Sequence, residues 1–226
     1  MRRLISDGLE VHFTFSTHED EARKMEAEEG ARAHQVNFEE TWSPPELSLD
    51  VLVNNAGVNL SGRPFFNDDR EVLQRTFLVN VDAAVRLATT YAPGMIERHY
   101  GRIVNINSIY GYRGPAKRMS YVASKFALRG ATLSMSRDLA AYGITVNEVN
   151  PGPVRSRMLD SMGQAAVGEG RFDSLADYYS DVIEGVPIGS LIAPEDIANV
   201  VSFLSQPAAR AITGVSIPVD GGILAG

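Results

Sequence analysis

Short runs of apolar, often β-branched residues alternate along the chain with longer segments in which apolar residues recur every three or four positions. The short runs predict strands and the longer segments predict helices. The predicted strands are residues 11–15, 33–36, 50–57, 101–108, 143–152 and 215–222. The predicted helices are 2–7, 18–29, 67–90, 121–142 and 194–205, with a partly helical excursion over 153–186. This alternation predicts an α/β fold with a doubly wound parallel sheet in one domain, residues 1–226.

Polar or glycine residues end three successive predicted strands. These ends are the NNAG segment at 54–57, Asn107 with Ser108, and the NPG segment at 150–152. The carboxyl ends of parallel strands lie on one edge of a sheet, and open α/β sheets bind ligands at that edge. The pattern therefore predicts a small-molecule site there.

Tyr121 and Lys125 are four positions apart on a predicted helix, so their side chains share one face. Further along, that face is mostly apolar and is expected to pack inward. A lysine on an inward face is costly unless a partner meets its charge, and an ammonium near a phenol lowers the pKa of the phenol. The pair thus predicts a proton donor and acceptor that works near neutral pH. The alternative is a surface tyrosine beside a lysine that lies along the surface.

Asn80 and Ser108 add to this pair. Asn80 is the polar position of an otherwise apolar helical stripe, and Ser108 ends a strand. Taken singly, Asn80 reads equally well as a buried amide that pairs with nearby backbone, and Ser108 as a turn or cap residue. Together with Tyr121 and Lys125 they form an ordered set that favours chemistry.

Composition narrows the choice of function. Lys and Arg number 21 and Asp and Glu number 28, for a net charge of −7, so we expect neither a nucleic-acid nor an anionic-membrane partner. The chain has no cysteine, which excludes disulfides and thiolate metal sites and fits a reducing, cytoplasmic location. We expect no metal site. The opening residues 1–10 lack a long apolar run, so we also expect no signal peptide.

In combination, these motifs resemble the short-chain dehydrogenase/reductase family over about residues 1–226. The matching segments are NNAG at 54–57, Asn80 in its helix, Ser108 in NINSIYG, and Tyr121 with Lys125 in YVASK. Pro151, Gly152 and Val154 match the family segment PG-x-V-x-T, in which Ser156 stands where threonine is usual. The ending at 212–222 matches the ITG…DGG pattern. The resemblance implies a Rossmann-like sheet and hydride transfer between a nicotinamide cofactor and a carbonyl or secondary alcohol.

The resemblance also implies catalytic roles for four residues. Tyr121 would protonate the carbonyl oxygen as hydride reaches the carbon, and Ser108 would hold that oxygen by a hydrogen bond. Lys125 would bind the nicotinamide ribose hydroxyls and lower the pKa of Tyr121. Asn80 would hold a water that relays protons to Lys125.

The cofactor expected from this reading is NADP(H), with NAD(H) as the alternative. Ser16 and Thr17 follow a predicted strand with no acidic residue until Glu19, so their hydroxyls could accept a 2′-phosphate. Alternatively, residues 16–18 are simply a polar loop. Asn37 stands where the family often has an adenine-binding aspartate. The other implied cofactor-binding residues are Asn54, Ala56, Gly57, Tyr121, Lys125, Pro151, Gly152, Val154 and Ser156.

One family feature does not occur in the printed sequence. The family begins with a strand and a TGxxxGxG turn, whose backbone N–H groups hold the pyrophosphate at a helix N-terminus. Here residues 2–7 resemble the end of the first helix and 11–15 the second strand. The glycines at 163–170 lack a preceding strand, so we read them as a false match. The sheet would lack its first, central strand, with 11–15 displaced or poorly ordered beside the gap. The proline-containing segment 42–48 stands where the family usually has a helix.

Three explanations remain open for this difference. The sequence represents a shortened form of an active reductase, or a variant that pairs its strands differently, or a reductase-like protein that has lost nucleotide binding. The last would be a non-catalytic scaffold or binding subunit.

The overall resemblance is strongest to the 3-oxoacyl-(acyl-carrier-protein) reductase branch. It implies a carbonyl or acyl-thioester substrate and an acyl carrier protein partner, with Arg98 and Arg137 near the site mouth as docking residues or as plain surface charge. The excursion 157–185 would be the substrate lid.

Helix 121–142 is apolar on a second face as well, which predicts a homodimer or homotetramer.

Overall fold

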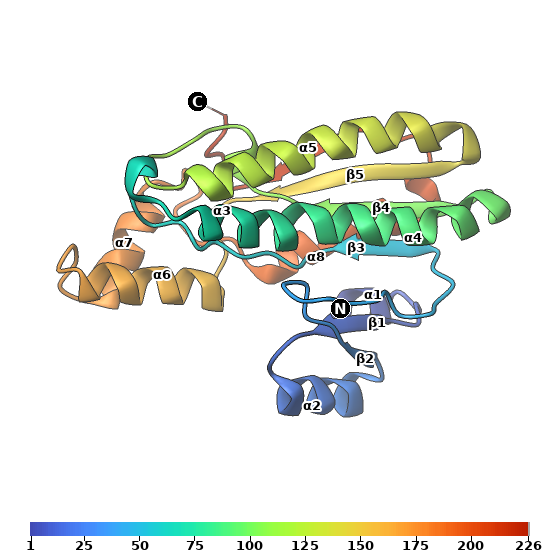
Figure 1. Cartoon of the computed structure of the whole chain (residues 1–226), viewed down its shortest axis with the longest axis horizontal. Helices are drawn as coiled ribbons and strands as arrows, with labels where there is room; N and C mark the ends of the chain where they lie inside the picture. Colours follow the sequence, from blue (N-terminus) through green and yellow to red (C-terminus); the bar gives the residue numbers. More distant parts are fainter. Residues whose placement is uncertain (226) are drawn as a thin grey trace.

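Two parallel sheets form the framework of the computed structural model, in which residues 1–225 are described. The larger sheet has the order β3-β4-β5-β6, and β1 and β2 form a separate two-stranded sheet. The strands are β1 (His12–Phe15), β2 (Arg32–Gln35), β3 (Val51–Asn54), β4 (Gly101–Ile106), β5 (Ile144–Pro151) and β6 (Ser216–Val219). All pairs are parallel, and the two-stranded sheet lies beyond the β3 edge of the larger one (Figure 1).

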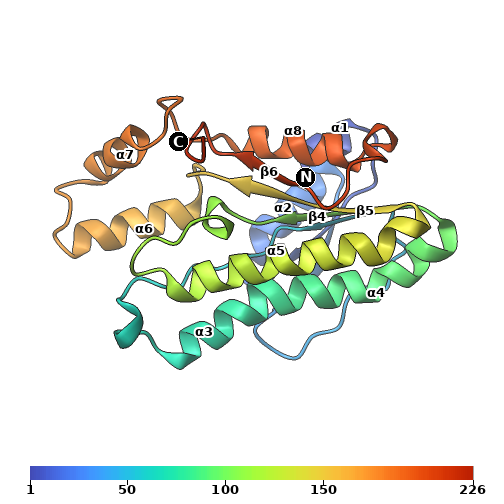
Figure 2. The ribbon, with the colours of Figure 1, turned by 90° about the horizontal axis from the view of Figure 1, so that it is seen from above.

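Helices cover both faces of the larger sheet. They are α1 (Arg2–Ser6), α2 (Glu19–Glu29), α3 (Arg70–Phe77), α4 (Ala83–Arg98), α5 (Met119–Leu139), α6 (Arg157–Gly168), α7 (Leu175–Glu184) and α8 (Pro194–Ser205). Figure 2 shows α3, α4 and α5 on one face and α8 with α1 on the other. The pair α6–α7 extends beyond the carboxyl edge of the sheet (Figure 1). The predicted doubly wound α/β fold is thus confirmed.

The strand gap expected from the sequence is present. Among residues 1–225, no strand is paired with the outer edge of β3, and β1 is paired only with β2. Strand β1 is regular and hydrogen-bonded to β2 in register, but it belongs to the separate sheet. The unpaired edges of β1 and β3 leave backbone donors and acceptors without ladder partners.

The predicted helix 67–90 is wrong in extent. The structure has α3, then a π-helical turn over Leu78–Asp82, then α4, which continues through Pro93 to Arg98. Packing outweighs the local proline signal, because Met95 in the last turns is fully buried against β3, β4 and β5.

The segment 42–48 contains no helix, as the sequence predicts. It contacts α4 and the residues that follow β2 instead. Trp42 packs with Val36, Phe38 and the start of α4. The Tyr91 hydroxyl on α4 donates to the carbonyl of Pro45 at 2.8 Å. Bulky side chains therefore cover the surface that a helix would otherwise cover.

Every helix within the described residues is too short or too polar to span a lipid bilayer. Among the same residues, no three histidine, aspartate or glutamate side chains gather in an arrangement that could hold a metal ion.

Candidate active site

The carboxyl edge of the larger sheet brings the predicted motifs together. β3 ends at Asn54 and leads into NNAG, β4 leads into Ser108, and β5 ends at Pro151. Helix α5 packs along β5 and against the turn after β4, so that Tyr121 and Lys125 face this edge. The inward face predicted for α5 is confirmed, because Leu128, Thr132 and Leu139 are buried while Met135 packs against the core.

Ser108 is held in extended conformation directly after β4. Its Oγ accepts from the backbone N–H of Tyr110 at 3.2 Å, which caps the 3₁₀ turn Ile109–Gly111. The Ser108 hydroxyl also lies close enough to the Tyr121 hydroxyl to lower the pKa of that phenol. Ser108 is therefore both a cap, as in the alternative reading, and a partner of the candidate proton donor.

Tyr121 is buried at the start of α5. Its ring meets that of Tyr110 edge-on, with centroids 6.1 Å apart, and its backbone N–H donates to the Ser61 hydroxyl at 3.3 Å. The Arg118 guanidinium donates to the carbonyl of Ser61 at 2.6 Å. The segment around Ser61 thus fixes the first turn of α5 and the position of the Tyr121 ring.

The prediction that Lys125 lowers the pKa of Tyr121 is wrong for this structure. Burial raises the pKa of Tyr121 to about 12, and the hydrogen bond from Ser108 only partly opposes it. The physical reason is that the phenolate would lose its hydration. Tyr121 is consequently a neutral phenol at physiological pH, which is the form that donates a proton.

Lys125 lies beneath Tyr121 and is 3% exposed. Its Nζ donates to the carbonyl of Ile106 at 3.1 Å and lies 5.5 Å from the centre of the Tyr121 ring. Burial lowers the pKa of Lys125 to about 8, and the negative charge of Glu148 opposes this. The ammonium has three N–H donors, so two remain for a ligand.

Substituting Lys125 with methionine should leave the protein at least as stable at pH 7. The pKa of Lys125 falls from an ordinary 10.5 to about 8 on folding, so the unfolded chain binds more protons between these values, and wild-type stability rises with pH across that window. Below pH 8 the buried ammonium costs about 3 kcal/mol. The variant loses this cost, while the unpaired Ile106 carbonyl costs about 1–3 kcal/mol. Urea unfolding at pH 7, 8.5 and 10 measures the difference. A variant clearly less stable than wild type at pH 7 would show that the ammonium stabilises the fold.

Asn80 lies in the π-helical turn between α3 and α4 and is fully buried. Its Oδ1 accepts from the N–H of Val58 at 2.8 Å, and its Nδ2 donates to the Val58 carbonyl at 2.9 Å and to Ser124 Oγ at 3.0 Å. The amide thereby pins the chain that follows NNAG, as the alternative reading of Asn80 stated. The water relay stays a prediction. π-Helical turns occur frequently at functional sites.

Gly57 borders Asn80 and Lys125. A Cβ at Gly57 would lie 3.5 Å from Asn80 Oδ1 and 3.8 Å from Lys125 Nζ, which are ordinary contact distances. The backbone at Gly57 thus lies beside both side chains. Ala56 beside it is exposed, and Asn54 is buried, with its Nδ2 bonded to the Ala84 carbonyl and to Asn105.

The segment after β5 is anchored by backbone contacts. The N–H of Gly152 donates to the Val219 carbonyl at 3.0 Å, and a Cβ at Gly152 would come within 2.9 Å of the Asp220 backbone. Val154 forms a parallel bridge with Ile192. Ser156 caps α6, since its Oγ accepts from Leu159 N–H at 3.4 Å.

The residues predicted for the adenosine half lie apart from this cluster. Ser16 and Thr17 form an exposed loop after β1, with Thr17 bonded to His18. Asn37 follows β2 and pairs with Glu40 at 2.6 Å and with the backbone of Glu39.

The cofactor implied by the motifs fits one half of this site. Lys125 lies beside the backbone of Gly57, and its free N–H donors suit ribose hydroxyls. For the pyrophosphate, residues 1–225 offer no glycine-rich turn on a strand between β1 and β3. The pyrophosphate half thus lacks the usual backbone cradle.

The excursion after β5 forms a helical hairpin with its own small core. Leu159, Ala166 and Tyr178 are buried in it, and Gly163 permits the close approach of α6 to α7, because a Cβ there would overlap Tyr178. Asn59, beyond NNAG, contacts the sulfur of Met162 at 3.7 Å. The glycines at 163–170 therefore serve packing and turns, in line with the sequence analysis.

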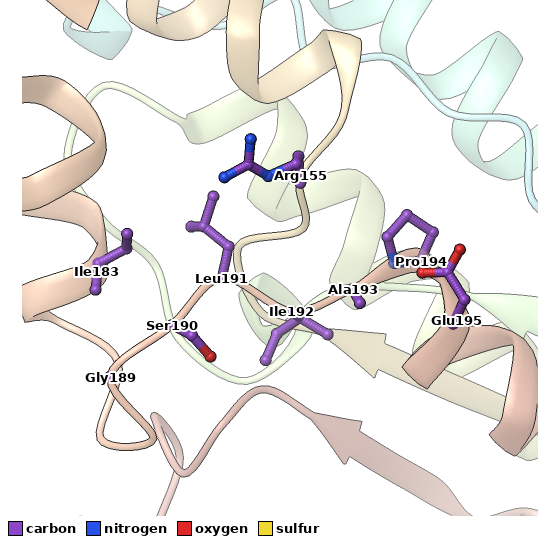
Figure 3. Close-up of a pocket in the computed structure, with 9 residues that line it drawn as sticks. All are labelled: Arg155, Ile183, Gly189, Ser190, Leu191, Ile192, Ala193, Pro194 and Glu195. Atoms are coloured by element: carbon purple, nitrogen blue, oxygen red, sulfur yellow. The ribbon is translucent and has the colours of Figure 1, made fainter. Parts of the chain in front are cut away.

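A cavity of about 340 Å³ lies at the base of this hairpin (Figure 3). It is lined by Arg155, the end of α7 at Ile183, the loop 189–193 and the start of α8. Ser108, Tyr121 and Lys125 are not among its lining residues. The cavity is therefore separate from the cluster of Ser108, Tyr121 and Lys125.

The placement of Arg98 and Arg137 near the site mouth is wrong. Arg98 ends α4 and donates to Ser48 Oγ at 2.8 Å and to the Leu49 carbonyl at 2.6 Å, next to the start of β3. Arg137 lies in the last turn of α5, about 24 Å along the helix from Tyr121. Both are at the amino end of the strands, because the helices antiparallel to these strands end there.

Sequence reasoning missed Glu148, and it named Asn107 only as a polar strand end. Both are buried next to the cluster, and the Nδ2 of Asn107 donates to Glu148 Oε2 at 2.9 Å. A signal was available in the sequence, since Glu148 is the one ionisable residue in the predicted strand 143–152.

Known proteins resemble the chain in sequence and structure. The family model described as enoyl-(acyl carrier protein) reductase matches residues 38–224. The chain belongs to the short-chain dehydrogenase/reductase family. Within this family, it is 35% identical to the 3-oxoacyl-(acyl-carrier-protein) reductase FabG of Rickettsia felis over 176 residues, 78% of this chain and 68% of the relative. It is 30% identical to the acetoacetyl-CoA reductase of Allochromatium vinosum over 175 residues, 77% of this chain and 66% of the relative.

Solved structures of the family extend the likeness to the whole fold. A variant of actinorhodin polyketide ketoreductase, solved with NADPH, superposes with a TM-score of 0.90 at 30% identity, covering 98% of this chain and 90% of the other. The short-chain dehydrogenase/reductase fold is therefore present despite the divided sheet.

Proposed function

We propose that the chain is a reductase that transfers hydride from NADPH to a ketone, with an acyl thioester as the favoured substrate class. The observation that carries the proposal is the buried cluster of Ser108, Tyr121 and Lys125, in which the Lys125 Nζ lies 5.5 Å from the centre of the Tyr121 ring. The relatives named as ketoreductase and 3-oxoacyl reductase support the same chemistry. NAD(H) remains the alternative cofactor.

Each residue of the cluster has a distinct task in this mechanism. Ser108 donates a hydrogen bond to the substrate carbonyl oxygen and so orients it. Tyr121, held neutral by burial, gives its hydroxyl proton to that oxygen. The free N–H groups of Lys125 hold the nicotinamide ribose. When bound, NADPH supplies the hydride.

The remaining assignments complete the proposal. Asn80 fixes the chain at Val58 and would order a water near Lys125. Ser16 and Thr17 would meet a 2′-phosphate, while Asn37 and Asn54 would border the adenosine half. Gly57 with Ala56, and Pro151 to Ser156, would line the nicotinamide side. The hairpin α6–α7 would cover the substrate as a lid, because Met162 contacts Asn59 across the edge.

The test is turnover of a panel of 3-oxoacyl thioesters, simple ketones and secondary alcohols with NADPH and with NADH. Thioesters linked to coenzyme A and to an acyl carrier protein are compared, because the carrier-protein partner is also part of the proposal. We expect reduction of at least one 3-oxoacyl thioester, faster with NADPH. No turnover of any substrate would contradict the reductase function.

A binding subunit without catalysis is the second candidate. The divided sheet and the missing pyrophosphate turn favour it. It predicts no heat of binding when NADPH or NADH is titrated into the protein. A calorimetric titration therefore separates the two candidates before any substrate is known.

We further propose that the chain assembles as a homodimer or homotetramer through α5. Phe126 and Leu133 are 46% and 49% exposed on its outer face. Light scattering at micromolar concentration should give at least twice the mass of one chain. The double variant Phe126→Lys with Leu133→Lys should shift toward the mass of one chain with unchanged circular dichroism. A wild-type protein that scatters as one chain contradicts this proposal.

A further inference from the structure

Glu148 is a buried acid on the same side of the sheet as the catalytic helix. It lies in β5, is 1% exposed, and shares its strand face with Val146, which packs against α5. Its Oε2 accepts from Asn107 Nδ2 at 2.9 Å, and its Oε1 accepts from the hydroxyl of Ser216 on β6. Both oxygens of the acid are thus used as acceptors.

The hydrogen bonds to Glu148 suit a carboxylate. An amide NH₂ such as that of Asn107 can only donate. The Ser216 hydroxyl donates to Glu148 and accepts from Asn150 Nδ2 at 3.3 Å. A buried carboxylate is costly unless a positive charge compensates it.

The compensating charge lies across the turn that follows β4. Lys125, itself 3% exposed, donates to the carbonyl of Ile106, and the next residue, Asn107, donates to Glu148. Ser108 comes immediately after. Three consecutive residues therefore connect the buried ammonium, the buried carboxylate and the candidate catalytic hydroxyl of Ser108.

We propose that Glu148 is a positioning residue of this site: it is the buried counter-charge that keeps Lys125 protonated, and through Asn107 it anchors the turn that carries Ser108. The role of Glu148 in catalysis rests on the proposed reductase function. Its effect on the charge of Lys125 is independent of any substrate. The attraction of Glu148 also opposes the effect of burial on the pKa of Lys125.

Other titratable groups around Lys125 do not take this role. Tyr121 on the same helix and Tyr110 on the 3₁₀ turn carry phenols, not carboxylates. Arg129, one turn further along α5, is cationic, and it stacks on Tyr112 at 4.0 Å and donates to the Gly111 carbonyl.

The charged residues on the neighbouring elements β4 and the π-helical turn pair with groups other than Lys125. Arg102 on β4 bonds the carbonyls of Gly101 and Gly143 at the opposite end of the sheet. Asp82 in the π-helical turn pairs with Arg86. Glu148 on β5 is therefore the carboxylate placed to meet Lys125.

The experiment is direct titration of Lys125 by NMR in protein labelled with ¹³C at the lysine Cε. The chain has three lysines, and the exposed Lys24 and Lys117 serve as internal references. The Lys125→Met variant identifies the Lys125 signal by its loss. In Glu148→Gln, which keeps the shape of the side chain, we expect the Lys125 midpoint to fall by about one pH unit or more. Glu148→Ala gives the same readout if the glutamine variant does not fold.

Two controls separate charge from packing. Ser216→Ala removes one hydrogen bond to the same carboxylate and keeps its charge, so the Lys125 midpoint should stay within about 0.3 units of wild type. Glu148→Asp should restore most of the shift. A Lys125 midpoint unchanged in Glu148→Gln, with Lys24 and Lys117 also unchanged, overturns the proposal.

Kinetics add a second readout. If the chain reduces ketones, Glu148→Gln should move the loss of kcat/KM at alkaline pH downward by the same amount as the Lys125 midpoint. If wild type turns over no substrate, the reductase function fails while the titration still decides the role of Glu148. The two failures are thereby distinguishable.

Discussion

Tyr121→Phe is expected to lower turnover at least about 100-fold while leaving the melting temperature nearly unchanged. In the proposed mechanism the phenol hydroxyl is the proton donor, and burial raises the pKa of Tyr121 to about 12, so the proton is present throughout the neutral range. The ring remains packed edge-on against Tyr110. Ser108 Oγ still accepts from the N–H of Tyr110, so its cap of the 3₁₀ turn is kept.

Tyr110→Phe is the matched control, because it removes a phenol hydroxyl from the neighbouring ring and leaves the Tyr121 proton in place. Steady-state kinetics and thermal melts are measured on both variants. Activity retained in Tyr121→Phe would show that another group is the acid. A fall of several degrees in melting temperature would instead indicate that the hydroxyl is structural.

Most of the fold could be predicted from local sequence patterns. The strands were found because β-branched runs end in glycine or polar residues, and α8 because Pro194 and two acidic residues begin it. The end of α4 was missed because Pro93 is a strong local break signal, whereas burial of Met95 depends on the distant strands β3 to β5. Contacts of this kind are not encoded in a window of neighbouring residues.

The candidate site, like the fold, could be predicted where local sequence patterns determine it and not where distant contacts do. Asn80, Ser108, Tyr121 and Lys125 were found because each stands at a strand end or on one helix face. The direction of the Tyr121 pKa was missed, since spacing reveals that Lys125 is near but not how deeply both groups are buried. Arg98 was misplaced because sequence position alone does not say at which end of the sheet a helix finishes. Glu148 was missed because its two hydrogen-bond partners are distant in sequence: Asn107 lies in the turn after β4 and Ser216 lies in β6.

Adding an N-terminal strand and a TGxxxGxG turn ahead of α1 is expected to strengthen NADPH binding at least about 100-fold over the printed chain, a difference of roughly 2.7 kcal/mol. In the printed chain the pyrophosphate would meet no row of backbone N–H donors at a helix N-terminus. The nicotinamide side would still meet Lys125 and the segment at Pro151-Gly152. The adenosine side would have Asn37, Asn54 and the loop at Ser16. Calorimetric titration of both proteins measures the difference.

The added strand and the added turn act in different ways, and a second extension separates them. The strand would pair with the free edges of β1 and β3 and so stabilise the fold. An extension with the same strand but valine in place of the turn glycines should raise the melting temperature similarly and leave NADPH binding weak, because side chains would block the approach of the phosphates. Tight binding of NADPH by the printed chain, with its pyrophosphate held by another loop, would contradict the prediction and indicate that this fold holds the cofactor in a different way.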